Sequence, residues 1–513
     1  MKRNFIIISL LLPLLLFAQF APRSYDIYSG GALDNAEPEA RLSSSVIIDI
    51  APGATADEIW LGTGYGVSLL TMHGDASGRT YDFLSWSSAQ GLGKGGVSGL
   101  AVTDSLIFVG TAFDTTVGIS GAGGGLAYSR DNGQTWTWFQ QPMDRLYDLQ
   151  PNGYDNVLGY WPTATNVDNI TYAIALSDSF IWTVSKGAGV RRHRYDDDYT
   201  DYNDTTGWHV VTTDSFAFNP LEHLNHRCFS VIYDGEAVWV GSAEGISKSL
   251  DEGQTWSRYT SGTHNISGNF VTALAYQEAT GSVWASTWKA EGANEYYAVS
   301  KTDDGGATWS VHLTEDQIAA AIGHSATPRV HGFGFDGEIV YACDDLGLWK
   351  SADGGNSWDL FPLIEDSIKL GHQFFEPDMF TAYKGDDLLW VGGADGLAVS
   401  QSNGANWYTF QSSLPVKDAA RSTDTYAYPN PFSPQRQEVV RFRFDSPGGQ
   451  VKVKVYDFSM TEVVSLPAVT VAPGEEYTVW DGKKNGKVVA NGVYFYKIEK
   501  PDGDVWGKII ILD

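Results

Sequence analysis

The chain has 513 residues, of which 43% are hydrophobic and 13% aromatic, and its formal net charge is −28 at pH 7. This composition is typical of a globular protein, and so acidic a chain is disfavoured as a ligand of nucleic acid or of an anionic membrane surface. The only two cysteines, Cys228 and Cys343, fall in different sequence repeats, which predicts two buried thiols rather than a disulfide.

The first residues have the pattern of an export signal. Lys2 and Arg3 precede an apolar run from Phe5 to Phe17, and Ala18 or Ala21 offers a small residue for cleavage. We therefore predict a signal peptide over residues 1–21. The run is too short to span a bilayer, and no cysteine follows it as a lipid anchor. The expected mature protein is secreted or lies on the outer cell surface, with no transmembrane segment.

An apolar segment with a large aromatic residue recurs seven times between residues 43 and 414. Another β-patterned stretch precedes each copy, so each unit supplies strands A, B, C and D of one small sheet. Sheets of this size must stack on neighbours to bury their faces, which predicts an all-β, seven-bladed β-propeller over residues 43–414. The seven copies are Ile59–Gly62, Ile107–Gly110, Ile181–Val184, Val238–Gly241, Val283–Ser286, Val340–Cys343 and Leu389–Gly392.

Four octapeptides of the form Ser/Thr-x-Asp-x-Gly-x-Thr/Ser-Trp lie between strands C and D. We expect tight hairpins in which the hydroxyl and carboxylate bind turn amides, the glycine supplies a positive φ, and the tryptophan folds back onto the apolar layer. A fifth copy, Ser400–Trp407, lacks the aspartate, and Trp86 and Trp208 stand in for the tryptophan in units one and three. The structural positions are Ser129, Asp131, Gly133, Trp136, Ser249, Asp251, Gly253, Trp256, Thr302, Asp304, Gly306, Trp309, Ser351, Asp353, Gly355 and Trp358.

These octapeptides resemble the Asp-box (bacterial neuraminidase, BNR) repeat of the sialidase, sortilin and xyloglucanase superfamily. The resemblance implies a propeller fold, and it makes glycoside hydrolysis a candidate function. The sequence lacks the Arg-Ile-Pro segment that sialidases typically carry ahead of their first repeats.

Long segments fall mostly at the end of the blades away from the hairpins, where the B–C turns and D–A crossovers lie. We expect binding on this loop-rich face. Its candidate binding residues are Arg145, Arg227 and Arg329, which could hold a carboxylate, and Trp161 and Trp288, which could stack on sugar rings. The alternatives are arginines paired with an acidic surface and tryptophans that anchor their own loops. The segments are Thr111–Gly124, Gln140–Asp168, Thr212–Asn225, Ser286–Tyr296 and His312–Thr327.

A glycosidase would need two carboxylates facing one cleft, about 5–9.5 Å apart. The candidates are Asp144, Glu222, Glu291, Glu376 and Asp378, but 62 acidic residues make such candidates unremarkable, and a non-enzymatic protein is favoured. Asp197, Asp201 and Asp204 could bind Ca²⁺, although their segment lacks the glycine and closing glutamate of an EF-hand and also fits a solvated turn. No other cofactor is expected.

The pattern changes after Leu414, with a polar linker over 415–425 and alternating strands of a small antiparallel β-sandwich over 426–513. Tyr428-Pro429-Asn430-Pro431-Phe432, the Gly492–Tyr496 strand and the terminal Lys508–Leu512 strand resemble type IX secretion C-terminal sorting domains. The Trp480-Asp481-Gly482 region is also similar to the Ig-like fold of hook-capping proteins. The resemblance implies a secretion machinery as partner, with surface attachment of the propeller as one outcome. An adhesion or spacer domain is the alternative.

Together these features predict a secreted or cell-surface propeller that presents a loop-rich face to a protein or glycan. The alternative function is an Asp-box glycoside hydrolase acting on extracellular polysaccharide or sialoside.

Overall fold

A computed structural model describes residues 38–75, 78–114, 121–142, 168–195, 198–199, 207–290, 292–367, 372–412, 425–435, 437 and 439–512. The predicted signal peptide and nearly all of the predicted linker lie outside these residues. The chain divides into two compact units. The first contains residues 64–66 and 86–311, and the second contains residues 38–63, 67–85 and 312 onwards.

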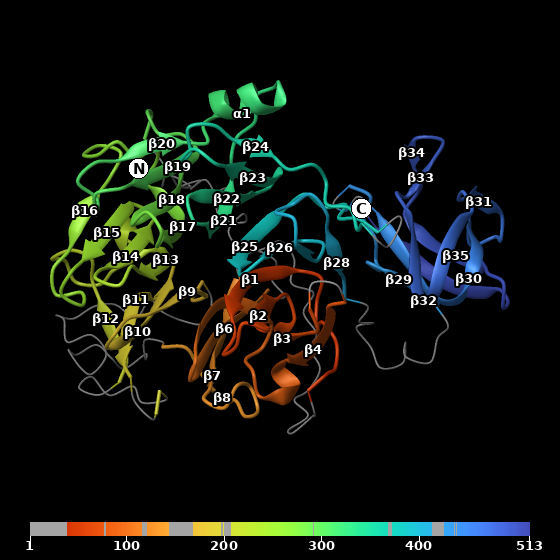
Figure 1. Ribbon diagram of the computed structural model, residues 1–513, viewed down its shortest axis with the longest axis horizontal. Helices are drawn as coiled ribbons and strands as arrows, with labels where there is room; N and C mark the ends of the chain where they lie inside the picture. The colour runs from red at the N-terminus through yellow and green to blue at the C-terminus, as the bar shows by residue number, and fades with distance from the viewer. Residues whose placement is uncertain are drawn as a thin grey trace, which may run out of the picture. The chain divides into compact units, whose positions relative to one another are not determined.

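The fold is a seven-bladed β-propeller followed by a C-terminal β-sheet module, as the sequence predicted (Figure 1). Each blade is a four-stranded antiparallel sheet whose strands are adjacent in chain order. Blade 1 is β1–β4 (Ile47–Pro52, Glu58–Thr63, Gly66–His73, Thr80–Trp86), blade 2 is β5–β8 (Gly96–Thr103, Leu106–Asp114, Gly121–Ser129, Thr137–Phe139), and blade 3 is β9–β12 (Thr171–Leu176, Phe180–Ser185, Gly189–Arg194, His209–Val211). Blade 4 is β13–β16 (Cys228–Tyr233, Val238–Ser242, Gly245–Ser249, Ser257–Tyr259), and blade 5 is β17–β20 (Phe270–Gln277, Ser282–Trp288, Ala298–Thr302, Ser310–His312). Blade 6 is β21–β24 (Val330–Asp336, Ile339–Asp344, Gly347–Ser351, Asp359–Leu360), and blade 7 is β25–β28 (Met379–Gly385, Leu388–Gly393, Leu397–Ser400, Tyr408–Phe410).

Each of the seven repeated aromatic segments forms the second strand of its blade, and its large side chain is buried between neighbouring sheets. In the first unit, Trp239 of blade 4 shares a core with Leu274 of blade 5. In the second unit, Trp390 of blade 7 belongs to one cluster with Ile47 and Leu61 of blade 1. The first and last blades therefore pack directly on each other, and the propeller closes there by side-chain packing without a shared strand.

The octapeptides form the C–D hairpins. In the blade 4 copy, Asp251 accepts hydrogen bonds from the hydroxyls of Ser249 (2.8 Å) and Thr255 (2.6 Å) and from the Thr255 N–H (2.8 Å). The Gly253 N–H donates to the Ser249 hydroxyl (2.7 Å), with a φ of 85° at Gly253. The copies at residues 129–136, 302–309 and 351–358 repeat these contacts.

The hairpins without a full octapeptide differ from one another. In the fifth copy, the Ser402 hydroxyl replaces the carboxylate and accepts from the Asn406 N–H at 2.9 Å. Trp208 directly precedes β12 and is fully buried, so it holds the expected position. Trp86 does not, because it ends β4 instead of preceding it.

Two segments predicted as B–C loops are strand at their ends. Strands β6 and β7 extend to Asp114 and back to Gly121, and β18 extends to Trp288. Glycines 123 and 124 lie inside β7 because the backbone is approached closely there. A Cβ on Gly124 would lie 1.9 Å from the Lys94 carbonyl oxygen, and one on Gly123 would lie 2.1 Å from the Gln141 amide nitrogen.

The C-terminal module is a curled antiparallel sheet built around the long strand β30. The first half of β30 pairs with β29 and β32, and its second half pairs with β31 and β35, so that Phe442, Val453, Trp480 and Tyr496 meet in one core. Gly448, with a φ of 90°, lies at the bend between the halves. The strands are β29 (Thr425–Tyr428), β30 (Val440–Tyr456), β31 (Glu462–Ser465), β32 (Val469–Trp480), β33 (Lys483–Lys484), β34 (Lys487–Val488), β35 (Gly492–Glu499) and β36 (Val505–Ile511).

Both cysteines are free and buried, as predicted. Within the described residues, no helix is long and apolar enough to cross a membrane. The single α-helix in that part of the chain is α1, Glu315–Ile322, which lies in the crossover from blade 5 to blade 6.

Candidate functional site on the loop-rich face

The crossover from blade 3 to blade 4, residues 212–227, belongs to the loop-rich face and is described along its whole length. It joins β12 to β13 at the end of the blades opposite the octapeptide hairpins, and it contains a short 3₁₀ helix, η2 (Leu224–His226). We call it the 212–227 loop. Its tip exposes two large apolar side chains, Phe216 (58% exposed) and Leu221 (72% exposed).

The loop is held by a polar network around Asp214. This carboxylate accepts hydrogen bonds from the Asn225 amide (2.6 Å), the Phe216 N–H (2.9 Å) and the His226 ring (3.1 Å). Burial alone would raise the pKa of Asp214, but these bonds, led by that from Asn225, outweigh burial and lower it. The loop therefore keeps an ionised carboxylate at its centre.

His226 has a defined protonation pattern in this network. Its Nδ1 accepts from the Asn219 N–H at 3.0 Å, so its Nε2 carries the hydrogen that is donated to Asp214. Burial lowers the pKa of His226, and Asp214 opposes that shift. Because both ring nitrogens are engaged inside the loop, His226 is a positioning residue and not an exposed acid or base. Its ring stacks on Phe218 at 5.6 Å between centroids.

Side-chain contacts also fix the tip of the loop. The Asn219 side chain accepts from the N–H groups of Leu221 (3.0 Å) and Glu222 (3.3 Å), and the His223 ring stacks on Phe216 at 4.8 Å. Fixed in this way, the exposed Phe216 and Leu221 lose little conformational entropy on binding a partner. Sequence reasoning identified the crossover but not this arrangement, because Asp214 and His226 lie twelve residues apart in a segment without a regular period.

The candidate binding residues that the structure describes each have contacts of their own. Arg227 donates to the carbonyl oxygens of Pro220 and Leu221, and Arg329 of the second unit pairs with Asp345 at 3.6 Å. Arg145 and Trp161 lie outside the described residues. Trp288 is not available to a sugar, because it lies in β18, is only 2% exposed, and donates to Ser286 Oγ at 2.7 Å. The prediction that Trp288 stacks on a ligand was therefore wrong.

The candidate carboxylates have separate environments. Glu222 is exposed on the 212–227 loop of the first unit, and Glu376 and Asp378 are half-buried ahead of β25 in the second. Asp144 and Glu291 lie outside the described residues, as do the calcium candidates Asp197, Asp201 and Asp204. Among the described residues, no group of three or more His, Cys, Asp or Glu side chains could hold a metal ion.

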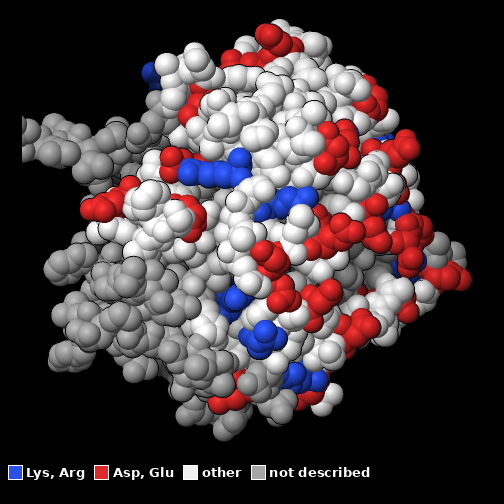
Figure 2. Space-filling view, turned by 90° about the vertical axis from the view of Figure 1, so that its left-hand side faces the viewer, with Lys and Arg blue, Asp and Glu red and all other residues white. Residues whose placement is uncertain are grey.

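One face of the molecule is rich in acidic side chains. Figure 2 shows a face of the molecule on which Asp and Glu are spread widely among fewer Lys and Arg side chains. The charge is unevenly divided along the chain. Residues 426–513 carry eleven basic and eleven acidic side chains, so the whole net charge of −28 belongs to residues 1–425.

Comparisons with known proteins concern the fold. No protein-family model and no curated protein sequence matches the chain. Among solved structures, PorZ, a surface component of the type IX secretion system of Porphyromonas gingivalis, is 16% identical with a TM-score of 0.37 over 91% of this chain and 66% of that one. An ancestral GH74 enzyme is 15% identical with a TM-score of 0.47 over 92% and 63%. YCF48 from Cyanidioschyzon merolae is 13% identical with a TM-score of 0.39 over 71% and 98%. The chain thus spans just under two thirds of the length of the PorZ and GH74 structures.

Proposed function

We propose that this protein is a secreted or cell-surface β-propeller that binds an extracellular protein or glycan through its loop-rich face. The observation that carries the proposal is the 212–227 loop. Its internal hydrogen bonds fix the backbone while Phe216 and Leu221 stay exposed, which is the arrangement of a preorganised binding anchor.

The proposal includes the route of export. The octapeptide hairpins support an Asp-box propeller, and the sequence motifs of residues 426–513 support a type IX-like sorting module. Deletion of residues 426–513 should leave the propeller in the periplasm, whereas deletion of the signal at 1–21 should leave it in the cytoplasm. Normal release of the chain without residues 426–513 would contradict the sorting role.

The binding role is tested by replacing the exposed anchors. The double variant Phe216→Ser, Leu221→Ser should lose at least tenfold in affinity for the partner recovered by cross-linking or on a glycan array. Leu250→Ser is the matched control, because Leu250 is 69% exposed on the hairpin at the opposite end of the neighbouring blade. Equal loss in both variants would contradict a role specific to the loop-rich face.

A glycoside hydrolase remains the alternative function. It requires two carboxylates facing one cleft at a separation of about 5–9.5 Å. A hydrolysis screen over sialosides and plant or algal glycans tests it, with Glu222, Glu376 and Asp378 replaced one at a time by alanine. Activity that vanishes in one of these variants would replace the binding function with catalysis.

A further inference from the structure

A groove of about 660 Å³ lies within the second unit. It is bounded by the outer strand of blade 1 (β4), the outer strand of blade 7 (β28) and strand β30 of the C-terminal module. Its volume is within the range of ligand sites, which often form where domains meet.

Three aromatic rings form one wall of the groove. Tyr81 and Phe83 of β4 each meet Phe410 of β28 edge to face, with centroids 4.9 and 5.4 Å apart. All three side chains are only partly buried. Rings locked in this way offer apolar area at little cost in side-chain entropy.

Charged and hydrogen-bonding groups line the rest of the groove, including the Asp82 carboxylate, which pairs with His73 at 3.0 Å. Arg443 of β30 is 9% exposed, with its guanidinium over the Tyr477 ring at 5.5 Å. Arg41, ahead of β1, also lines the groove and is fixed by Glu39, which accepts from its Nε and Nη2 at 2.9 and 2.7 Å. The remaining polar lining groups are the side chains of Thr71, His372, Thr409, Gln411 and Ser412.

The walls are held together by contacts between blade 7 and the module. The Arg441 guanidinium binds both oxygens of Asp395 at 2.6 and 2.5 Å, and both side chains are buried. His372 binds Glu476 at 3.0 Å and packs on the Tyr477 ring at 4.1 Å. The groove is therefore preformed, so a ligand does not have to assemble it.

We propose that this groove binds an acidic glycan, with sugar rings on the aromatic wall and a uronate carboxylate at Arg443 and Arg41. A sugar ring has one apolar face and a rim of hydroxyls, which matches aromatic rings bordered by hydroxyl and amide side chains. Guanidinium groups suit a planar carboxylate. The groove also lies where the electrically neutral module meets the acidic blades, so an anion is repelled less there. This inference rests on the glycan branch of the proposed function and names its ligand class.

The test measures binding of the full exported chain to tetragalacturonate and tetramannuronate by calorimetry. We expect binding of at least one acid tetramer, and at least tenfold weaker binding of its methyl ester. Arg443→Met, Arg41→Gln and Phe410→Leu should each weaken binding of the acid at least fivefold, and the preference for acid over ester should shrink in the two arginine variants.

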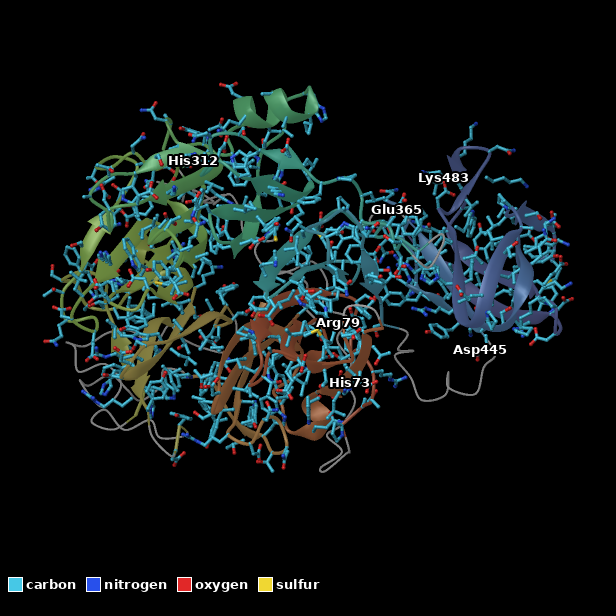
Figure 3. The ribbon with its side chains drawn as sticks, in the orientation of Figure 1. His73, Arg79, His312, Glu365, Asp445 and Lys483 are labelled. Carbon is cyan, nitrogen blue, oxygen red and sulfur yellow. The ribbon has the colours of Figure 1, made fainter. Side chains whose placement is uncertain are left out.

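Lys483→Met is the matched control. Lys483 lies in β33 of the C-terminal module (Figure 3), pairs with Asp481 at 3.7 Å, and does not line the groove. Its replacement should leave glycan affinity unchanged, and thermal unfolding of all four variants checks that each is folded. Arg41→Gln keeps the test valid if Arg443→Met fails to fold.

Two results would overturn the inference and are distinguishable from each other. Glycan binding that survives all three groove variants overturns this site and leaves the proposed function intact. Failure of the wild-type chain to bind any acidic or neutral glycan overturns both this site and the glycan branch of the function, whereas the protein branch is tested separately by Phe216 and Leu221.

Discussion

The aspartate at the third position of each octapeptide shows how one side chain can determine a turn. Its carboxylate accepts hydrogen bonds from the hydroxyl and the N–H of the residue four positions later in the chain. It also accepts one from the serine or threonine hydroxyl two positions earlier. Each bond is to an ionised acceptor, which makes it stronger than a neutral one. These carboxylates are therefore structural, and they are not available as catalytic groups.

Loss of one such carboxylate should destabilise its hairpin in a pH-dependent way. The Thr255 hydroxyl and N–H lower the pKa of Asp251 from 3.8 to about 2. A lowered pKa in the folded state means that the stabilisation is present above about pH 4 and is lost as the pH falls through about 2. At pH 7, Asp251→Ala should cost about 1–2 kcal/mol, since four hydrogen bonds to the carboxylate are lost at a partly exposed site.

The measurement is urea unfolding of wild type and Asp251→Ala between pH 7 and pH 2.5. The difference between the two proteins should narrow as the pH falls. The exposed Asp359 of β24 supplies the control, because Asp359→Ala should change stability by less than about 0.5 kcal/mol at either pH. A gap between wild type and Asp251→Ala that does not vary with pH would contradict the role of the ionised carboxylate.

At the scale of secondary-structure elements, the C-terminal module docks on blade 7 through a buried ion pair. Burial raises the pKa of Asp395, while Arg441 and the Phe375 N–H oppose the rise. Removing one partner would leave a buried charge without its counterion. Arg441→Met should therefore cost about 3–5 kcal/mol, and the double variant with Asp395→Leu should recover part of that loss.

Denaturant unfolding of the two single variants and the double variant measures the coupling between Asp395 and Arg441. Lys500 and Asp502, 2.8 Å apart on the module surface, form the reference pair, and Asp502→Asn should leave the denaturant midpoint almost unchanged, because exposed ion pairs contribute little to stability. Additive losses at Asp395 and Arg441 would show that the pair does not hold the module to blade 7.

The sequence predicts features that recur in every blade, but it does not predict features that depend on contacts between distant segments. The seven aromatic second strands were predicted because burial between two sheets demands a large apolar side chain at a fixed place in every repeat. The described ends of the predicted 111–124 loop are strand instead, at residues 111–114 of β6 and 121–124 of β7. A run of glycines indicates a turn unless one knows that Lys94 and Gln141 approach the backbone. The Asp214–His226 pairing and the groove beside Arg443 depend on contacts between distant segments, for which a single sequence carries no signal.

At the scale of the whole molecule, the uneven charge has a consequence for stability. All of the net charge of −28 lies outside the neutral C-terminal module, so repulsion within the propeller opposes folding. Raising the salt from 0.01 to 0.15 M shortens the screening length from about 30 to about 8 Å. The melting temperature should rise by about 1 °C for each kcal/mol of repulsion removed, because a propeller of this length has an unfolding entropy of about 0.8 kcal/mol/K. Sodium and potassium chloride should act alike in calorimetry, and a fall in melting temperature would show that surface ion pairs dominate instead.

The contact between blades 7 and 1 differs from the other contacts between blades, because no crossover connects these two blades. Each pair of consecutive blades is joined by a crossover, but blades 7 and 1 are held by packing of Trp390 with Ile47 and Leu61 and by two hydrogen bonds from Ser412, to Leu42 and Ser45. Trp390→Ala should cost about 3–5 kcal/mol, as should Trp239→Ala at the equivalent strand position of blade 4.

The two variants should differ in native-state hydrogen exchange. Because no crossover tethers blades 7 and 1, Trp390→Ala should let β1, β2 and β26 exchange through local opening, whereas Trp239→Ala should leave β14 and β17 exchanging only by global unfolding. If amide protection falls equally throughout both variants, the contact between blades 7 and 1 is no weaker than the contacts between blades that a crossover joins.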